Sequence, residues 1–206
     1  MTRRLLALPL LAAALLTGCS ADPGPSLMVQ KAGTDAPYAA KFDRAYFAEA
    51  AGGQVDVVLL SDGQGPSPEV DRPLRTSDDK TVRQVVHLRV LWANPKGIRL
   101  DNPSASNAMV SWHVIASDND RLAYAGSAWT RVSVDGDAAT LDIRNAEIAV
   151  REVVGGCQDP LKRANLTGQI VAKRADATVR SYLEEIATLE KTEATASSPA
   201  RPAAMH

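Results

Sequence analysis

Alternation of apolar and polar residues through the middle of the chain predicts β-strands. Residues 81–94 carry apolar side chains at most even positions, while Arg83, His87 and Arg89 occupy the opposite face. A repeat of two over a dozen residues is typical of a strand with one buried face. Residues 108–117 resume this alternation after a loop and predict a second strand. The side chains expected to face the core are those of Val82, Val86, Leu88, Val90, Trp92, Val110, Trp112 and Val114.

A β-hairpin is predicted around Asp135-Gly136, because this dipeptide separates two further alternating segments. Asp-Gly between such segments favours a two-residue turn. Counting outward from the turn pairs Val134 with Asp137, Val132 with Ala139, Thr130 with Leu141 and Ala128 with Ile143. This register places the apolar members of both strands on one face, as burial requires.

The segment before these strands has two interpretations. The alanine content of residues 38–51 favours a helix. Alternatively, residues 44–50 form a strand that turns at Gly52-Gly53 into a second strand over residues 54–60. Residues 61–79 are polar, with two glycines and three prolines, and predict a long loop.

The last part of the chain predicts a strand and then a helix. Residues 166–176 are expected to form the final strand, and the Asp176 carboxylate can cap the helix by accepting from first-turn amides. A helical apolar stripe follows, which packs either on the sheet or on a partner protein. Residues 192–206 are small and polar and predict a disordered tail. The stripe consists of Val179, Tyr182, Leu183, Ile186 and Leu189.

Together these elements predict a mainly β domain over residues 38–191. The expected fold is an antiparallel β-sandwich of six to eight strands with a C-terminal α-helix, because many short alternating segments precede one helical segment.

The first 18 residues have the pattern of a secretory signal peptide. Arg3 and Arg4 precede an apolar run over residues 5–16. This run is too short to cross a bilayer as a helix, which needs roughly 20 apolar residues. Positive charge followed by such a run is typical of a signal that is removed from the mature protein, and we assign it to residues 1–18.

The apolar run ends in Leu16-Thr17-Gly18-Cys19, which resembles the lipobox of bacterial lipoproteins. The resemblance implies that the Cys19 thiol carries diacylglycerol, with palmitate or similar chains, and that the signal is cut before it. By resemblance to Gram-negative lipoproteins, Ser20 implies an outer-membrane location facing the periplasm. Residues 19–37, with three prolines and two glycines, suit a flexible tether between the lipid and the domain.

The charge of the chain limits its expected partners. Loss of residues 1–18 would remove two of the 23 Lys and Arg residues and none of the 24 Asp and Glu residues, leaving a net charge of −3 with neutral histidines. A nearly balanced chain has no long-range attraction to nucleic acid. We therefore expect no nucleic-acid partner, and attachment to the membrane through the lipid on Cys19.

Two of the three histidines suggest a metal site. If the strands around His87 and His113 pair with residue numbers that sum to 200, the two imidazoles face each other. With Asp101 they could bind a metal ion, although two separate surface histidines are the alternative. The sequence contains no Gly-x-Ser-x-Gly, no His-Glu-x-x-His and no phosphate-binding glycine loop. We therefore expect no catalytic centre and no cofactor.

Residues 92–103 predict an interaction loop, because two Asn-Pro pairs bracket a basic and amide-rich stretch. The alternative is a structured crossover between sheets. The side chains that the loop would present are those of Asn94, Lys96, Arg99, Asp101 and Asn102.

Cys157 is the only cysteine besides Cys19. It is either a reactive thiol or intermolecular bridge, or a small buried apolar side chain.

The leading functional hypothesis is a lipid-anchored envelope protein whose β-rich domain binds another envelope protein or has a structural role, without catalysis. One alternative is a carrier of lipid or of a small ligand in a cavity between the sheet and the C-terminal helix. Another is a metal-dependent sensor or enzyme that uses His87 and His113.

Overall fold

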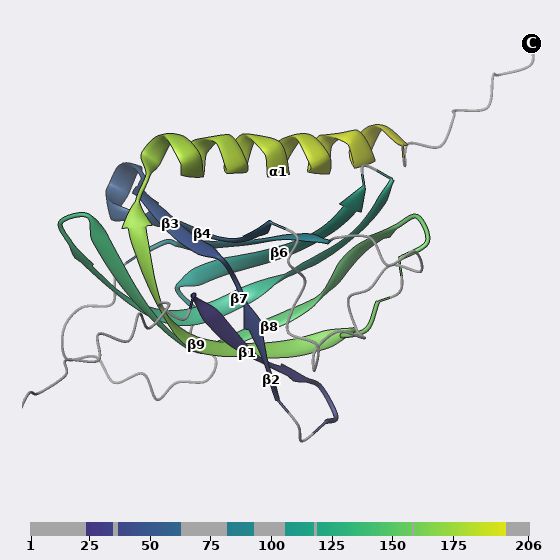
Figure 1. Ribbon diagram of the computed structural model, residues 1–206, viewed down its shortest axis with the longest axis horizontal. Helices are drawn as coiled ribbons and strands as arrows, with labels where there is room; N and C mark the ends of the chain where they lie inside the picture. Colours follow the sequence, from purple (N-terminus) through teal and green to yellow (C-terminus); the bar gives the residue numbers. More distant parts are fainter. Residues whose placement is uncertain are drawn as a thin grey trace, which may run out of the picture.

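The chain forms nine β-strands and one long α-helix in a computed structural model that describes residues 24–34, 37–62, 82–92, 106–117, 119–157 and 159–196 (Figure 1). The predicted signal peptide and Cys19 lie outside these residues. The elements are β1 (Ser26–Lys31), β2 (Tyr38–Lys41), β3 (Arg44–Glu49), the 3-10 helix η1 (Ala51–Gly53), β4 (Val55–Asp62), β5 (Arg83–Val90), β6 (Ala108–Ser117), β7 (Asp120–Asp135), β8 (Ala138–Val154), β9 (Arg163–Arg174) and α1 (Asp176–Ala196).

All nine strands belong to one sheet, in the order β2-β1-β9-β3-β4-β5-β6-β7-β8. Because β8 also pairs with β9, the seven strands from β3 to β9 form a nearly closed ring. The ring closes where β3 runs parallel to β9 over two residue pairs, Tyr46 with Lys173 and Phe47 with Arg174. The other pairings among the described strands are antiparallel.

The structure confirms a mainly β, antiparallel fold with a C-terminal helix. It differs from the predicted sandwich, because a single sheet curves round on itself where two facing sheets were expected. The two longest strands, β7 and β8, have 16 and 17 residues, and their pairings contain irregularities such as that between Trp129 and Thr130. Bulges of this kind bend a strand and increase its twist, which lets a long strand follow the curve of the ring.

Side chains that point into the ring form the main core. Trp112 is fully buried there, and its ring centroid lies 6.3 Å from that of Phe42 and 6.1 Å from that of Tyr124. The predicted core residues from Val82 to Val90 and from Val110 to Val114 are buried as expected. Trp92 is instead 47% exposed, because it lies beyond the end of β5.

The predicted hairpin joins β7 to β8, but its register differs by two residues. Asp135 pairs with Ala138 and Val134 with Ala139, so the two turn residues are Gly136 and Asp137. Gly136 has a φ of +56°, which suits a hairpin turn that needs glycine at its first central position. A shift of two residues keeps every side chain on its predicted face.

The N-terminal part contains more strands than the sequence predicted. Residues 26–31, assigned to the tether, form β1 between β2 and β9, because Leu27 and Val29 point into the core and are almost completely buried. This alternation is too short to stand out in the sequence. For residues 38–51 the strand interpretation is confirmed and the helical one is wrong, since Arg44–Glu49 is β3.

Helix α1 lies across the outer surface of the sheet (Figure 1) and packs on β3 and β4. Val179 and Ile186 from the predicted stripe form a second apolar cluster with residues of β4 and β5, so the packing of the stripe on the sheet is confirmed. The helix extends to Ala196, past the predicted boundary at residue 191, and residues 197–206 lie outside the description. Among the described residues, no helix combines the length and the apolar character needed to cross a membrane.

Candidate functional site

The predicted interaction loop connects β5 to β6, and its candidate contact residues lie outside the described part of the chain. The described residues at its two ends are Trp92 and Ser106. The candidate contact residues outside the description are Asn94, Lys96, Arg99, Asp101 and Asn102.

Asn107 joins the two ends of this loop. Its buried side-chain amide donates to the backbone oxygens of Trp92 (3.0 Å) and Thr130 (2.8 Å), and its Oδ1 accepts from the amide of Thr130 at 2.8 Å. Its backbone oxygen also accepts from the amide of Leu91. One polar side chain therefore ties the end of β5 to β7, and the loop leaves the sheet from a fixed base.

The two candidate metal-binding histidines do not face each other. His87 pairs with Ser111 and His113 pairs with Val85, so the residue numbers of paired positions sum to 198. The predicted register was wrong by two residues, because alternation alone cannot distinguish registers that differ by two. Both histidines still lie on the outer face of the sheet, in diagonal positions.

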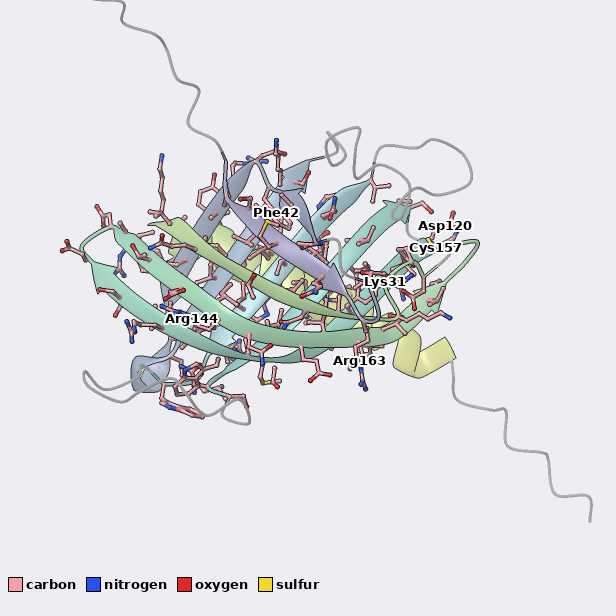
Figure 2. The ribbon with its side chains drawn as sticks, turned by 90° about the horizontal axis from the view of Figure 1, so that it is seen from below. Lys31, Phe42, Asp120, Arg144, Cys157 and Arg163 are labelled. Carbon is pink, nitrogen blue, oxygen red and sulfur yellow. The ribbon has the colours of Figure 1, made fainter. Side chains whose placement is uncertain are left out.

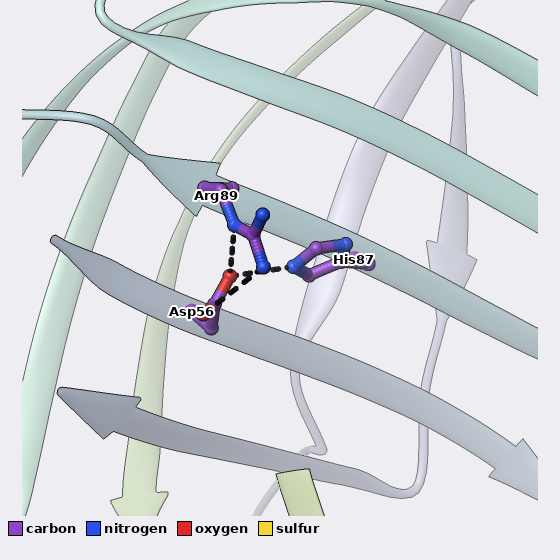
Figure 3. Close-up of polar contacts among 3 residues, drawn as sticks. All are labelled: Asp56, His87 and Arg89. Atoms are coloured by element: carbon purple, nitrogen blue, oxygen red, sulfur yellow. Dashed lines mark hydrogen bonds and ion pairs between the residues drawn. The ribbon is translucent and has the colours of Figure 1, made fainter. Parts of the chain in front are cut away.

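His87 belongs to a different cluster, which it forms with Asp56 of β4 and Arg89 of its own strand (Figure 3). Nε2 of His87 lies 2.8 Å from Oδ1 of Asp56, and Nε of Arg89 donates to the same oxygen at 2.8 Å. Nη2 of Arg89 lies 3.5 Å from Oδ2 of Asp56. Asp56 pairs with Arg89 across the two strands, and its side chain is only 6% exposed.

The surroundings of Asp56 favour its charged form. Burial alone would raise the pKa of this carboxyl group. Hydrogen bonds from His87 and Arg89, together with the attraction of their charges, outweigh burial and hold the pKa below its ordinary value of 3.8. The carboxylate is therefore ionised at neutral pH.

This cluster is an ion-pair network that links β4 to β5. In the sequence, the only sign of this cluster is a charged residue, Asp56, between apolar residues in the first part of β4. Metal binding through Nε2 of His87 would require breaking the bond to Asp56. Among the residues that the structure describes, no three His, Cys, Asp or Glu side chains form a group that could hold a metal ion.

A pocket of about 560 Å³ lies where the ring closes, and we call it the seam pocket. It is formed by the start of β1, the first half of β3 and the second half of β9. The lining residues that matter below are Gly24, Pro25, Asp43, Arg44, Val171 and Lys173.

A second pocket, of about 370 Å³, lies at the other end of β1, near the labelled Lys31 and Arg163 (Figure 2). Arg163 lies 3.5 Å from a carboxylate oxygen of Glu147. Asn165 also lines this pocket, and its Oδ1 accepts from the amide of Ala146 at 3.2 Å. Both polar groups thus have partners within the sheet.

Cys157 is partly buried and packs against the main core, as expected for a small apolar side chain. Burial raises the pKa of its thiol, and the negative charge of the nearby Asp120 raises it further (Figure 2). A thiol with a raised pKa holds little thiolate at neutral pH, so these surroundings do not favour a reactive cysteine.

Comparison of the chain with protein-family models, curated proteins and solved structures finds no match in any of the three.

Proposed function

We propose that this protein is a lipid-anchored component of the bacterial cell envelope, with a β-rich body that has a non-catalytic binding or structural role. The observation that carries the proposal is the order of a charged start, a short apolar run and Leu16-Thr17-Gly18-Cys19. Ser20 favours the periplasmic face of an outer membrane.

The folded body begins close to the proposed anchor, which supports this function. β1 starts at Ser26, seven residues after Cys19, so the link is much shorter than a tether to residue 37. The amide of Phe42 donates to the carbonyl oxygen of Pro25 at 2.8 Å, and this bond holds the start of the body in place. A lipid on Cys19 would therefore keep the folded body at the membrane surface.

The binding role rests on the loop between β5 and β6. Its two described ends are joined by Asn107, so the loop begins and ends on a fixed base. We expect an envelope protein partner to contact Lys96 and Arg99. Capture of that partner by the membrane-bound protein should fall when both are changed to glutamate, and unchanged capture would contradict this location of the interface.

The carrier hypothesis is less favoured, because it requires a continuous apolar cavity between the sheet and α1. The described side chains there pack into a cluster that occupies this interface. Its buried members are Val58, Leu60, Val85, Val179 and Ile186.

Labelling with palmitate in bacterial cells tests the anchor. We expect the wild-type protein to incorporate the label and to fractionate with membranes. Cys19→Ala should lose the label, and it should leave the membrane fraction once its unprocessed signal peptide is removed. Cys157→Ala is the matched control, since it removes the other cysteine and should keep both properties. A wild-type protein without label would overturn the proposal, and so would a Cys19→Ala protein that stays equally membrane-bound without its signal peptide.

A further inference from the structure

We propose that the seam pocket binds the phosphate headgroup of an anionic phospholipid in the bilayer that carries the anchor. The inference rests on the proposed function, because lipidation of Cys19 would bring this pocket to a membrane. It assigns the membrane-facing side of the body to the start of β1 and the adjoining parts of β3 and β9.

The pocket lies within reach of the anchor. Gly24 and Pro25 line it, and Cys19 is five residues before Gly24. An extended chain spans at most about 3.6 Å per residue, so Cys19 lies no more than about 18 Å from Gly24. The backbone at Gly24 is packed tightly, since an added Cβ would lie only 2.3 Å from the carbonyl oxygen of Phe42. The first described residue therefore lies at the pocket itself.

Positive side chains gather at this end of the sheet. Arg44 and Lys173 line the pocket from the two strands that close the ring. Lys41 lies on β2, opposite the first residue of β1, and adds a third positive charge nearby. Asp43 is the only acidic residue among the described residues that line the pocket.

This combination suits a phospholipid headgroup. Phosphate oxygens accept strong, charge-assisted hydrogen bonds from arginine and lysine. Val171, which also lines the pocket, is 62% exposed and offers an apolar contact beside the cations. A headgroup presents the same pairing, because its phosphate lies next to the start of the acyl chains.

The second pocket provides a comparison within the same protein. It also has two cations, Lys31 and Arg163, but it lies at the far end of β1 from the anchor. We therefore expect Lys31 and Arg163 to contribute little to membrane binding.

Flotation of the mature chain, residues 19–206 with Cys19→Ala, with lipid vesicles tests the inference. One set of vesicles contains phosphatidylcholine alone, and the other contains equal amounts of phosphatidylcholine and phosphatidylglycerol. Because one Lys or Arg near an anionic surface changes partitioning by about fivefold, Arg44→Gln/Lys173→Gln should bind the anionic vesicles about 25-fold more weakly. Binding to phosphatidylcholine alone should be weak for the parent and the variant.

Lys31→Gln/Arg163→Gln is the matched control, because it changes the net charge equally. Its binding should stay within about twofold of the parent, since its charges lie farther from the surface than the screening length. Equal weakening of both double variants, or no weakening of Arg44→Gln/Lys173→Gln, would overturn the inference. If that double variant fails to fold, Lys173→Gln alone, at an exposed position, should still weaken binding about fivefold.

Soluble glycerol phosphate separates a membrane site from a site for a free phosphate ester. Binding of glycerol phosphate to the pocket without binding to anionic vesicles would overturn the membrane inference. The vesicle assay needs no lipid on the protein, whereas palmitate labelling reads only the anchor. Failure of one proposal is thus distinguishable from failure of the other.

Discussion

Asp56 illustrates how a buried charge is stabilised on the outer face of this sheet. Its side chain is nearly inaccessible, yet His87 and Arg89 both reach the same carboxylate oxygen from the neighbouring strand. Arg89 is 42% exposed, so its charge remains partly solvated while Asp56 is buried. The cluster therefore avoids most of the cost of burying a complete ion pair.

Replacement of Asp56 by asparagine should lower the free energy of unfolding by about 2–3 kcal/mol at neutral pH. Hydrogen bonds to a charged group contribute about 1.5–3 kcal/mol, and the variant weakens those from His87 and Arg89. Urea denaturation measures the change. Asp142→Asn is the control, because Asp142 pairs with the exposed Arg144 and should cost less than about 1 kcal/mol. If both variants lost the same free energy of unfolding, the buried cluster around Asp56 would be no more stabilising than an exposed ion pair.

The pH dependence of this difference follows from the lowered pKa of Asp56. A carboxyl group with a lower pKa in the folded state stabilises the protein fully above its ordinary value of 3.8. That stabilisation is lost as the pH falls through the lowered pKa. The stability difference between wild type and Asp56→Asn should thus shrink as the pH falls below 3.8. A difference that grows in acid would contradict this assignment.

Individual residues show what the sequence could and could not reveal about the site. Asp56 stands out in the sequence as a charge between apolar residues, but its partners lie 31 and 33 residues away. Their contact depends on the register between β4 and β5, which no local pattern contains. The seam pocket was missed for the same reason, because it joins segments that meet only when the ring closes.

At the scale of strands, alternation predicted the faces well and the registers poorly. The β7–β8 hairpin and the β5–β6 pair both differ from the prediction by two residues in the sum of paired positions. A side chain returns to the same face of a strand every two residues. The same side chains are therefore buried in the predicted register and in the observed one. The turn decides between them, and in the hairpin Gly136 with its positive φ selects Gly136-Asp137.

The entry of the chain into β1 depends on a glycine. Because a Cβ on Gly24 would lie 2.3 Å from the carbonyl oxygen of Phe42, Gly24→Ala should push the two backbone segments apart. Hydrogen exchange should then be faster at the Phe42 amide, which donates to Pro25. Gly156→Ala is the control, since its Cβ would have ordinary van der Waals space. Unchanged protection at Phe42 would show that the close approach is not required.

At the scale of the whole molecule, the ring and the helix share strands β3, β4 and β5. Val57 and Leu59 of β4 point into the ring, whereas Val58 and Leu60 on the same strand pack under α1. The sequence predicted the helix and its apolar stripe, and it predicted a mainly β body. It did not predict the ring, because closure depends on β9 pairing with β3, which lies far before it in the chain.

Shared strands imply that the ring and the helix unfold together. Ile186 is 7% exposed under the helix, and Ile186→Ala should cost about 2–4 kcal/mol through lost burial and a cavity. Because β4 and β5 belong to both apolar clusters, this loss should lower the unfolding midpoint equally by far-UV circular dichroism and by tryptophan fluorescence, which includes the buried Trp112. Arg180→Ala, at an exposed helix position, should change stability by less than about 0.5 kcal/mol. Two separate transitions in Ile186→Ala would instead mean that α1 can detach while the ring stays folded.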